Sequence, residues 1–388
     1  VSNFVPGGGI WMNTQRPEWN DANNALVGYG LSMVTLFHLR QYLDHLRSAV
    51  AGLENDDAGR SVELSREVTV WLDDVLAALR DHPVTSTVGT IDDEGVWRRA
   101  LLERLGRAAS RYRADIADGL SGERAEISRA HLLEWCDVAI VHLDGTIRAA
   151  RRDDGLVHSY NLLEIDPDGS TAGVRHLPEM LEGQVAALGT GILDPADQAA
   201  LLDALAASRL YRADIDTYLL APATIPPSFL DRNLVPAEMV STGSLLGALL
   251  EAGDDTVVRR DVEGNIRFHP DLIDAHALGA ALDRLARDPQ WTDLVDRDRH
   301  RVNEDYETVF GHRAHLGRSG TMYGYEGIGS VYWHMVTKLV LAVQEAVSDA
   351  ADAGADPATL DRLVQAYWRV RAGLGFTRPA EEFGAVPT

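Results

Sequence analysis

Hydrophobic residues recur at three- and four-residue steps along most of this chain, which predicts long amphipathic helices. The spacing first runs through residues 26–50, 63–79, 101–116 and 130–147. It returns later and predicts further helices over residues 178–188, 195–207, 276–287, 291–310, 328–349 and 357–374. At Asp194-Pro195 a helix start is marked directly, because aspartate caps a helix and proline suits its first turn.

Two segments break the helical pattern. Residues 156–165 are aromatic and β-branched, and residues 256–268 indicate two short strands about a turn. We therefore expect β-hairpin insertions within residues 153–177 and 254–270. The remaining helices predict a single all-α domain over residues 1–388, built from helical hairpins with small β excursions.

Charge and composition narrow the class of partner. The formal net charge of −23 argues against nucleic acid and anionic membranes as partners. No apolar run is long enough to cross a bilayer, and no secretory signal is present, so we expect a cytoplasmic protein. The chain begins with valine and ends at FGAVPT without a closing element, which suggests a piece of a longer polypeptide.

The sequence contains few residues in patterns that bind a metal or a cofactor. The one cysteine, Cys136, excludes an internal disulfide and any cysteine-rich metal site. His300 and Glu304 are four residues apart on a predicted helix, but the arginines around them favour a solvated helix face over metal binding. Phosphate-binding loops with GK[ST], HExxH and GxSxG are missing. We expect no metal and no cofactor.

Residues 11–24, WMNTQRPEWNDANN, are the richest segment in polar chemistry. Tryptophan covers the C–H faces of a sugar ring, amides pair with its hydroxyls, and an acid protonates a glycosidic oxygen. Asp21 is the candidate acid. An aspartate before a helix also acts as an N-terminal cap, but the crowding of amides and tryptophans around it favours a site. The predicted sugar contacts here are Trp11, Arg16, Glu18, Trp19, Asn20, Asn23 and Asn24.

Two further segments have comparable features. Residues 318–334 (RSGTMYGYEGIGSVYWH) place Tyr323, Tyr325 and Glu326 among four glycines, with Trp333 opening an apolar helix. A tight interhelical turn followed by an aromatic core stripe is the alternative. Residues 181–191 (LEGQVAALGTG) begin a helix with Glu182 and Gln184, where a first-turn glutamate favoured by the helix dipole explains the pattern equally well. We expect Gln184 and the aromatic residues Tyr323, Tyr325 and Trp333 to contact a sugar.

These segments occur in an order that resembles the inverting glycoside phosphorylases of the cellobiose and chitobiose phosphorylase type. The specific part reads Trp19-Asn20-Asp21, Asn23 or Asn24, Val27-Gly28, and then Gly30, Ser32, Val34 and Leu36. MLEGQVAALGTG (180–191) and EGIGSVYWHMV (326–336) are similar to a barrel helix and to the last loop and helix of those enzymes. The resemblance implies an (α/α)6 toroid, or its C-terminal part, with Asp21 as the general acid.

The chain departs from that family in two ways. It lacks the preceding β-sandwich and about the first half of the barrel, so the missing N-terminal part of the same enzyme is an expected partner. It also has Glu326-Gly327 where the family has a threonine-glycine pair that holds phosphate. An ionised carboxylate repels phosphate but is able to deprotonate water, as in related (α/α)6 hydrolases.

The sequence therefore predicts an enzyme that cleaves a glycosidic bond with inversion in an oligosaccharide or glycoside. Asp21 is its general acid and Glu326 its general base acting on water. One alternative is a phosphorylase, for which Arg16, Arg318, His176 or His269 would have to converge beside Asp21. Another is a non-catalytic carbohydrate-binding half-barrel.

Overall fold

The computed structural model describes residues 1–13, 26–53, 61–84, 91–222, 228–311 and 331–375. The contacts divide the chain into unit 1 (residues 1–223 and 327–388) and unit 2 (residues 224–326), which is inserted into unit 1. The sequence predicted a single domain over residues 1–388 and did not indicate this division into two units. Helical periodicity is the same in both units, and it does not tell which helix faces pack together.

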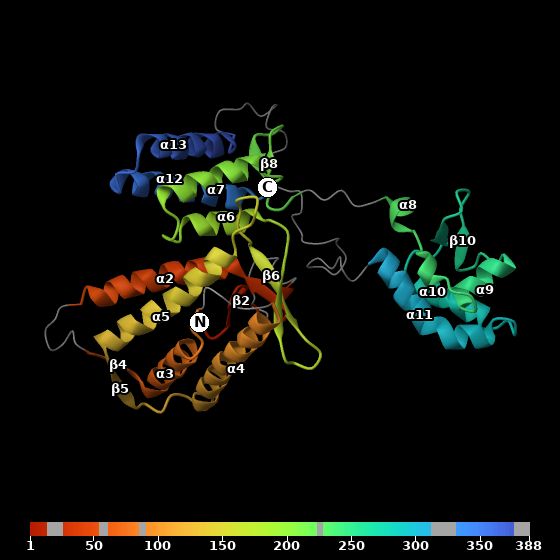
Figure 1. The fold of residues 1–388 in the computed structure, drawn as a ribbon, viewed down its shortest axis with the longest axis horizontal. Helices are drawn as coiled ribbons and strands as arrows, with labels where there is room; N and C mark the ends of the chain where they lie inside the picture. Colours follow the sequence, from red (N-terminus) through yellow and green to blue (C-terminus); the bar gives the residue numbers. More distant parts are fainter. Residues whose placement is uncertain (14–25, 54–60, 85–90, 223–227, 312–330, 376–388) are drawn as a thin grey trace. The chain divides into compact units, whose positions relative to one another are not determined.

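Unit 1 is a continuous row of helices in which each one contacts the next, in the order α4, α3, α5, α2, α6, α12, α13, α7 (Figure 1). Their apolar faces form one core that includes Phe37, Leu76, Leu143 and Leu339. A complete (α/α)6 toroid stays a prediction. The helix bounds are α2 Met33–Ala51, α3 Arg66–Arg80, α4 Ile91–Asp115, α5 Arg129–Ala149, α6 Leu181–Leu188, α7 Pro195–Ala207, α12 Trp333–Asp352 and α13 Pro357–Ala372.

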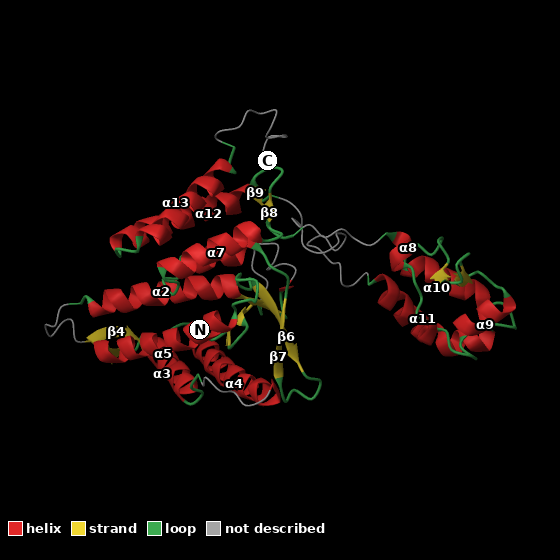
Figure 2. Ribbon diagram, turned by 45° about the horizontal axis from the view of Figure 1, so that its top comes forward, coloured by secondary structure: helices red, strands yellow, loops and turns green. Residues whose placement is uncertain are grey.

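An antiparallel five-stranded sheet lies beside these helices, in the order β1-β2-β3-β6-β7 (Figure 2). Its strands are β1 Phe4–Val5, β2 Gly9–Trp11, β3 Gly30–Ser32, β6 Tyr160–Ile165 and β7 Ala172–His176. The pairing puts Trp11, Leu31, Asn161 and His176 directly opposite one another in one row across the sheet. The β6–β7 hairpin lies within residues 153–177, whereas the first three strands were absent from the sequence prediction.

Two small strand pairs complete unit 1. Strand β4 (Ser61–Ser65) pairs with β5 (Arg124–Ser128), and β8 (Tyr211–Arg212) pairs with β9 (Thr217–Tyr218). Among the residues that the structure describes, no helix combines the length and apolar character needed for a membrane span.

Unit 2 has a hydrophobic core of its own, in which Phe268, Trp291 and Tyr306 are buried. Its elements are α8 Phe229–Arg232, η2 Ala237–Met239, α9 Leu245–Ala252, β10 Val258–Arg260, β11 Ile266–Phe268, α10 Ala275–Leu285 and α11 Thr292–Phe310. The β10–β11 hairpin lies within residues 254–270. On α11 the side chains of His300 and Glu304 are 87% and 69% exposed and 3.4 Å apart, as an ordinary surface pair. Within the described ranges, no group of three or more His, Cys, Asp and Glu side chains is placed to hold a metal ion.

Candidate functional site

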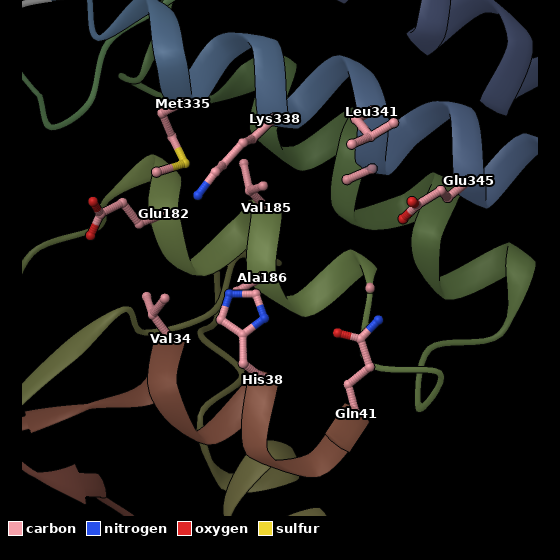
Figure 3. Close-up of a pocket in the computed structure, with 12 residues that line it drawn as sticks. Val34, His38, Gln41, Glu182, Val185, Ala186, Met335, Lys338, Leu341 and Glu345 are labelled. Carbon is pink, nitrogen blue, oxygen red and sulfur yellow. The ribbon is translucent and has the colours of Figure 1, made fainter. Parts of the chain in front are cut away.

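The candidate site is a pocket of about 310 Å³ between helices α2, α6 and α12 of unit 1 (Figure 3). Helix α6 contacts both of the other helices, so it forms the middle of the pocket wall. The volume falls at the lower end of the range that small-molecule sites usually have. The pocket is lined by Val34, His38, Gln41, Glu182, Val185, Ala186, Gly189, Met335, Lys338, Leu341, Ala342 and Glu345.

The three helices begin at the same end of this pocket. Val34, Glu182 and Met335 belong to first turns and lie together at one end, while Gln41 and Glu345 lie at the other (Figure 3). Helix starts carry partial positive charge from unpaired N–H groups, which favours anionic ligands nearby.

The two segments proposed to hold the catalytic acids each precede a pocket-lining helix in the sequence. Residues 14–25 lie between β2 and β3, and β3 leads directly into α2 through the capping residue Ser32. Only Val331 and Tyr332 separate residues 312–330 from α12. Asp21 and Glu326 themselves lie outside the described residues.

The pocket wall mixes apolar and charged groups. Val34, Val185, Met335 and Leu341 supply apolar surface, while Glu182, Glu345 and Lys338, the only lysine of the chain, supply charge. Two carboxylates against one ammonium group make the wall unsuited to a phosphate dianion. Apolar faces with hydrogen-bonding groups suit a neutral polyhydroxy ligand such as a sugar ring.

His38 adds an uncharged hydrogen-bonding group to this wall. Burial, followed by the charge of Lys338, lowers the pKa of His38 below its ordinary value, although a hydrogen bond with Gln41 acts in the opposite direction. The imidazole is therefore neutral at pH 7 and offers one donor and one acceptor.

The first turn of α6 is held in place by the residues that lead into β6. The Ser159 hydroxyl donates to the carbonyl of Met180 (3.0 Å) and accepts from the amide of Gly183 (3.0 Å). A Cβ atom on Gly183 would lie 2.3 Å from the Ser159 Oγ, so only glycine permits this approach. The glycine in the LEGQ motif is explained by this close packing.

Gln184, a predicted sugar contact, does not line this pocket. Its side chain is fully buried. The amide oxygen accepts from the amide of Val157 (2.9 Å), and the amide nitrogen donates to the carbonyls of Val157 (2.8 Å) and Met180 (2.9 Å). The polar groups of Gln184 are thus used by the backbone, and the residue joins α6 to the chain before β6.

Glu182 is the residue of this motif that faces the pocket. It is only partly buried, and its carboxylate accepts a hydrogen bond from the hydroxyl of Tyr160 in β6. The sequence left its role undecided between a helix-start glutamate and a site residue. Neither the buried tyrosine partner nor the adjoining α2 and α12 is visible in a local motif, so only the structure assigns it to the pocket wall.

The other predicted contacts are placed only in part. Trp11 ends β2 partly exposed, with its indole N–H donating to the carbonyl of Gly28 (3.1 Å), and Trp333 is the partly buried first residue of α12. The remaining predicted residues lie outside the described part of the chain: Arg16, Glu18, Trp19, Asn20, Asp21, Asn23, Asn24, Tyr323, Tyr325 and Glu326.

The basic residues considered for an anion pocket have different surroundings. His176 is in the same cross-strand row as Trp11, three strand spacings or about 14 Å away. Its Nδ1 is 2.8 Å from the Oδ1 of Asn161, and its ring stacks on that of His158. His269 belongs to unit 2, where its Nδ1 accepts from the amide of Asp271 (3.2 Å).

Comparison with known families gives a match in unit 2. This segment is similar to an accessory domain of carbohydrate-active phosphorylases. Residues 226–313 match the family model described as GH149 phosphorylase insertion domain 2. The matched residues fall within unit 2, residues 224–326, so the family segment and the compact unit coincide. No curated protein matches the chain. The match supports a relation to glycoside phosphorylases, and it does not point to the cellobiose and chitobiose type in particular.

Proposed function

We propose that this chain is part of a glycoside phosphorylase that cleaves a glycosidic bond with inversion, using phosphate as the nucleophile. The observation that carries the proposal is the coincidence of unit 2 with the insertion domain of a phosphorylase family. An insertion interrupts the domain that surrounds it, and here the surrounding domain is unit 1, which holds the described pocket. We therefore assign the chemistry to unit 1.

Two features of unit 1 support this assignment. The Trp19-Asn20-Asp21 segment resembles the acid-bearing segment of inverting phosphorylases. The pocket beside the starts of α2, α6 and α12 has the apolar and hydrogen-bonding groups that a sugar ring needs. Because Glu182 and Glu345 outweigh Lys338 in charge, this wall suits the sugar, and phosphate belongs outside it.

In the proposed reaction Asp21, as a carboxylic acid, donates its proton to the glycosidic oxygen while phosphate attacks the anomeric carbon from the opposite face of the ring. The bond between the anomeric carbon and the leaving oxygen breaks, and a bond to a phosphate oxygen forms. The products are a glycosyl phosphate of inverted configuration and a sugar with a free hydroxyl. The acid is reset by proton uptake from solvent.

The test is incubation of the protein with a panel of disaccharides and oligosaccharides of different linkage, with and without inorganic phosphate. We expect glycosyl phosphate to form only when phosphate is present. The variant Asp21→Asn removes the donated proton and is expected to lower kcat by at least a hundredfold. Asp349→Asn, which changes an exposed carboxylate on α12, is the matched control and is expected to retain activity.

Release of free sugar at the same rate without phosphate would instead support hydrolysis with Glu326 as the general base. Sugar binding without turnover, unchanged in Asp21→Asn, would support a non-catalytic carbohydrate-binding module. Either result would overturn the phosphorylase proposal.

A further inference from the structure

We infer that Tyr160 is a positioning residue, which holds the Glu182 carboxylate at the helix-start end of the pocket so that Glu182 binds a hydroxyl group of the sugar. The inference deepens the proposed function and rests on it for the identity of the ligand. It concerns a residue of β6 that does not line the pocket itself.

Tyr160 is almost completely buried. Its side chain is 1% exposed, and in the sheet it stands opposite Ser32, the residue that caps α2. From this buried position its hydroxyl reaches across to α6 and donates to the carboxylate of Glu182. A phenol that is buried needs a hydrogen-bond partner, and a charged acceptor makes a strong one.

Glu182 has the opposite environment. It is partly exposed and lines the pocket at the same end as Val34 and Met335 (Figure 3). A glutamate on the first helical turn has several side-chain rotamers available, and freezing it on binding costs conformational entropy. A hydrogen bond from an immobile tyrosine selects one orientation before the ligand arrives, which is preorganisation.

The backbone around this pair is held independently of the tyrosine hydroxyl. Ser159 is hydrogen-bonded to both Met180 and Gly183, and Gln184 is hydrogen-bonded to both backbone groups of Val157. Removing only the hydroxyl of Tyr160 should therefore leave α6 in place. A change in sugar binding would then report the orientation of Glu182 rather than a displaced helix.

The experiment compares Tyr160→Phe, Glu182→Gln and the double variant in phosphorolysis and in direct sugar binding. Tyr306→Phe is the matched control, because that tyrosine is also buried (2% exposed) and donates its hydroxyl to the carbonyl of Leu272 in unit 2. Binding of D-glucose and of cellobiose is measured by calorimetry, and unfolding temperatures are recorded for every variant.

We expect Tyr160→Phe to raise KM and the sugar Kd roughly tenfold, with kcat changed by less than about threefold. Glu182→Gln should weaken binding at least as much. The double variant should bind no more weakly than Glu182→Gln alone, because the two residues act through one contact. Tyr306→Phe should lower the unfolding temperature without changing KM or Kd.

Three results would overturn the inference. The first is wild-type sugar affinity in Tyr160→Phe. The second is a double variant whose loss equals the product of the single losses, since that shows independent roles. The third is the failure of the wild-type protein to bind either probe sugar. If the wild type binds sugar but shows no phosphate-dependent turnover, the proposed function fails, and the binding measurements alone still decide the role of Tyr160.

Discussion

Acid is expected to destabilise unit 1 through His158, whose imidazole is stacked on that of His176. The ring centroids are 3.9 Å apart and the ring planes differ by 7°. Burial, and then the charges of His176 and Arg152, lower the pKa of His158 to about 4. Within the described part of the chain, the buried Nδ1 of His158 has no hydrogen-bond partner, so no acceptor there would stabilise a proton on this atom.

Other groups near the pair limit how far this effect extends. Burial, followed by the charges of Arg152 and Arg98, also lowers the pKa of His176. Asp154 and the backbone of Leu177 act on His158 in the opposite direction, but less strongly. Protonation of His158 therefore brings a positive charge against a second imidazole and the guanidinium group of Arg152.

The direction and size of the change in unfolding free energy follow from the difference between the pKa of His158 in the folded and unfolded states. The pKa of a histidine in an unfolded chain is about 6.5, so below that pH the unfolded state takes up a proton that the folded state resists. The stabilising contribution of neutral His158 is complete above pH 6.5 and is lost as the pH falls toward 4. At pH 5 the loss from His158 alone is on the order of 2 kcal/mol of unfolding free energy.

Urea unfolding at pH 7.5 and pH 5.0 measures this contribution. Tryptophan fluorescence reports on unit 1, because every tryptophan except Trp291 belongs to it. His158→Phe keeps a flat ring but cannot be protonated, so it should lose about 2 kcal/mol less than the wild type on acidification. His45→Phe, at an exposed position of α2, should behave like the wild type. Equal acid sensitivity in wild type and His158→Phe would refute the reasoning.

Two further predictions concern packing. Gly183→Ala is expected to lower the free energy of unfolding by about 1–3 kcal/mol, because the added Cβ overlaps Ser159. In Gly106→Ala the added Cβ meets no atom within 4 Å, so this control should stabilise α4 by about 0.5–1 kcal/mol. The urea midpoints of unfolding of the two variants measure both effects. A Gly183→Ala protein as stable as the wild type would contradict the close packing of Ser159 against the first turn of α6. Unit 2 expressed alone is expected to fold, since it has its own buried core, and its thermal transition followed by Trp291 fluorescence should be cooperative. A gradual change in that fluorescence would mean that the core requires unit 1.

Helices in this chain are local features, and local patterns predicted many of them closely. The spacing over residues 63–79 corresponds to α3 (Arg66–Arg80), and that over 130–147 to α5 (Arg129–Ala149). The helix expected after Asp194 is α7, and Asp194 accepts a hydrogen bond from the amide of Asp197 as its cap. Such signals are readable because hydrophobic period and capping involve residues only a few positions apart.

The short strands were not predicted, because strand pairing depends on residues that are far apart in the sequence. The predicted helix over residues 26–50 begins instead at Met33, because Gly30–Ser32 forms strand β3 between β2 and β6. A three-residue strand has too few positions for an alternating pattern. Its pairing partner in β6 is more than a hundred positions away, so no local window contains the information.

The residues of the candidate site divide in the same way. From residue types and spacing alone, carboxylates, amides and tryptophans were seen to concentrate in a few segments, and a helix beginning with LEGQ was predicted. The folded chain was needed to show that Gln184 binds the backbone, that Glu182 lines the pocket, and that Tyr160 donates a hydrogen bond to Glu182. Residue type and period are encoded locally, whereas the role of a side chain depends on which distant groups the fold brings against it.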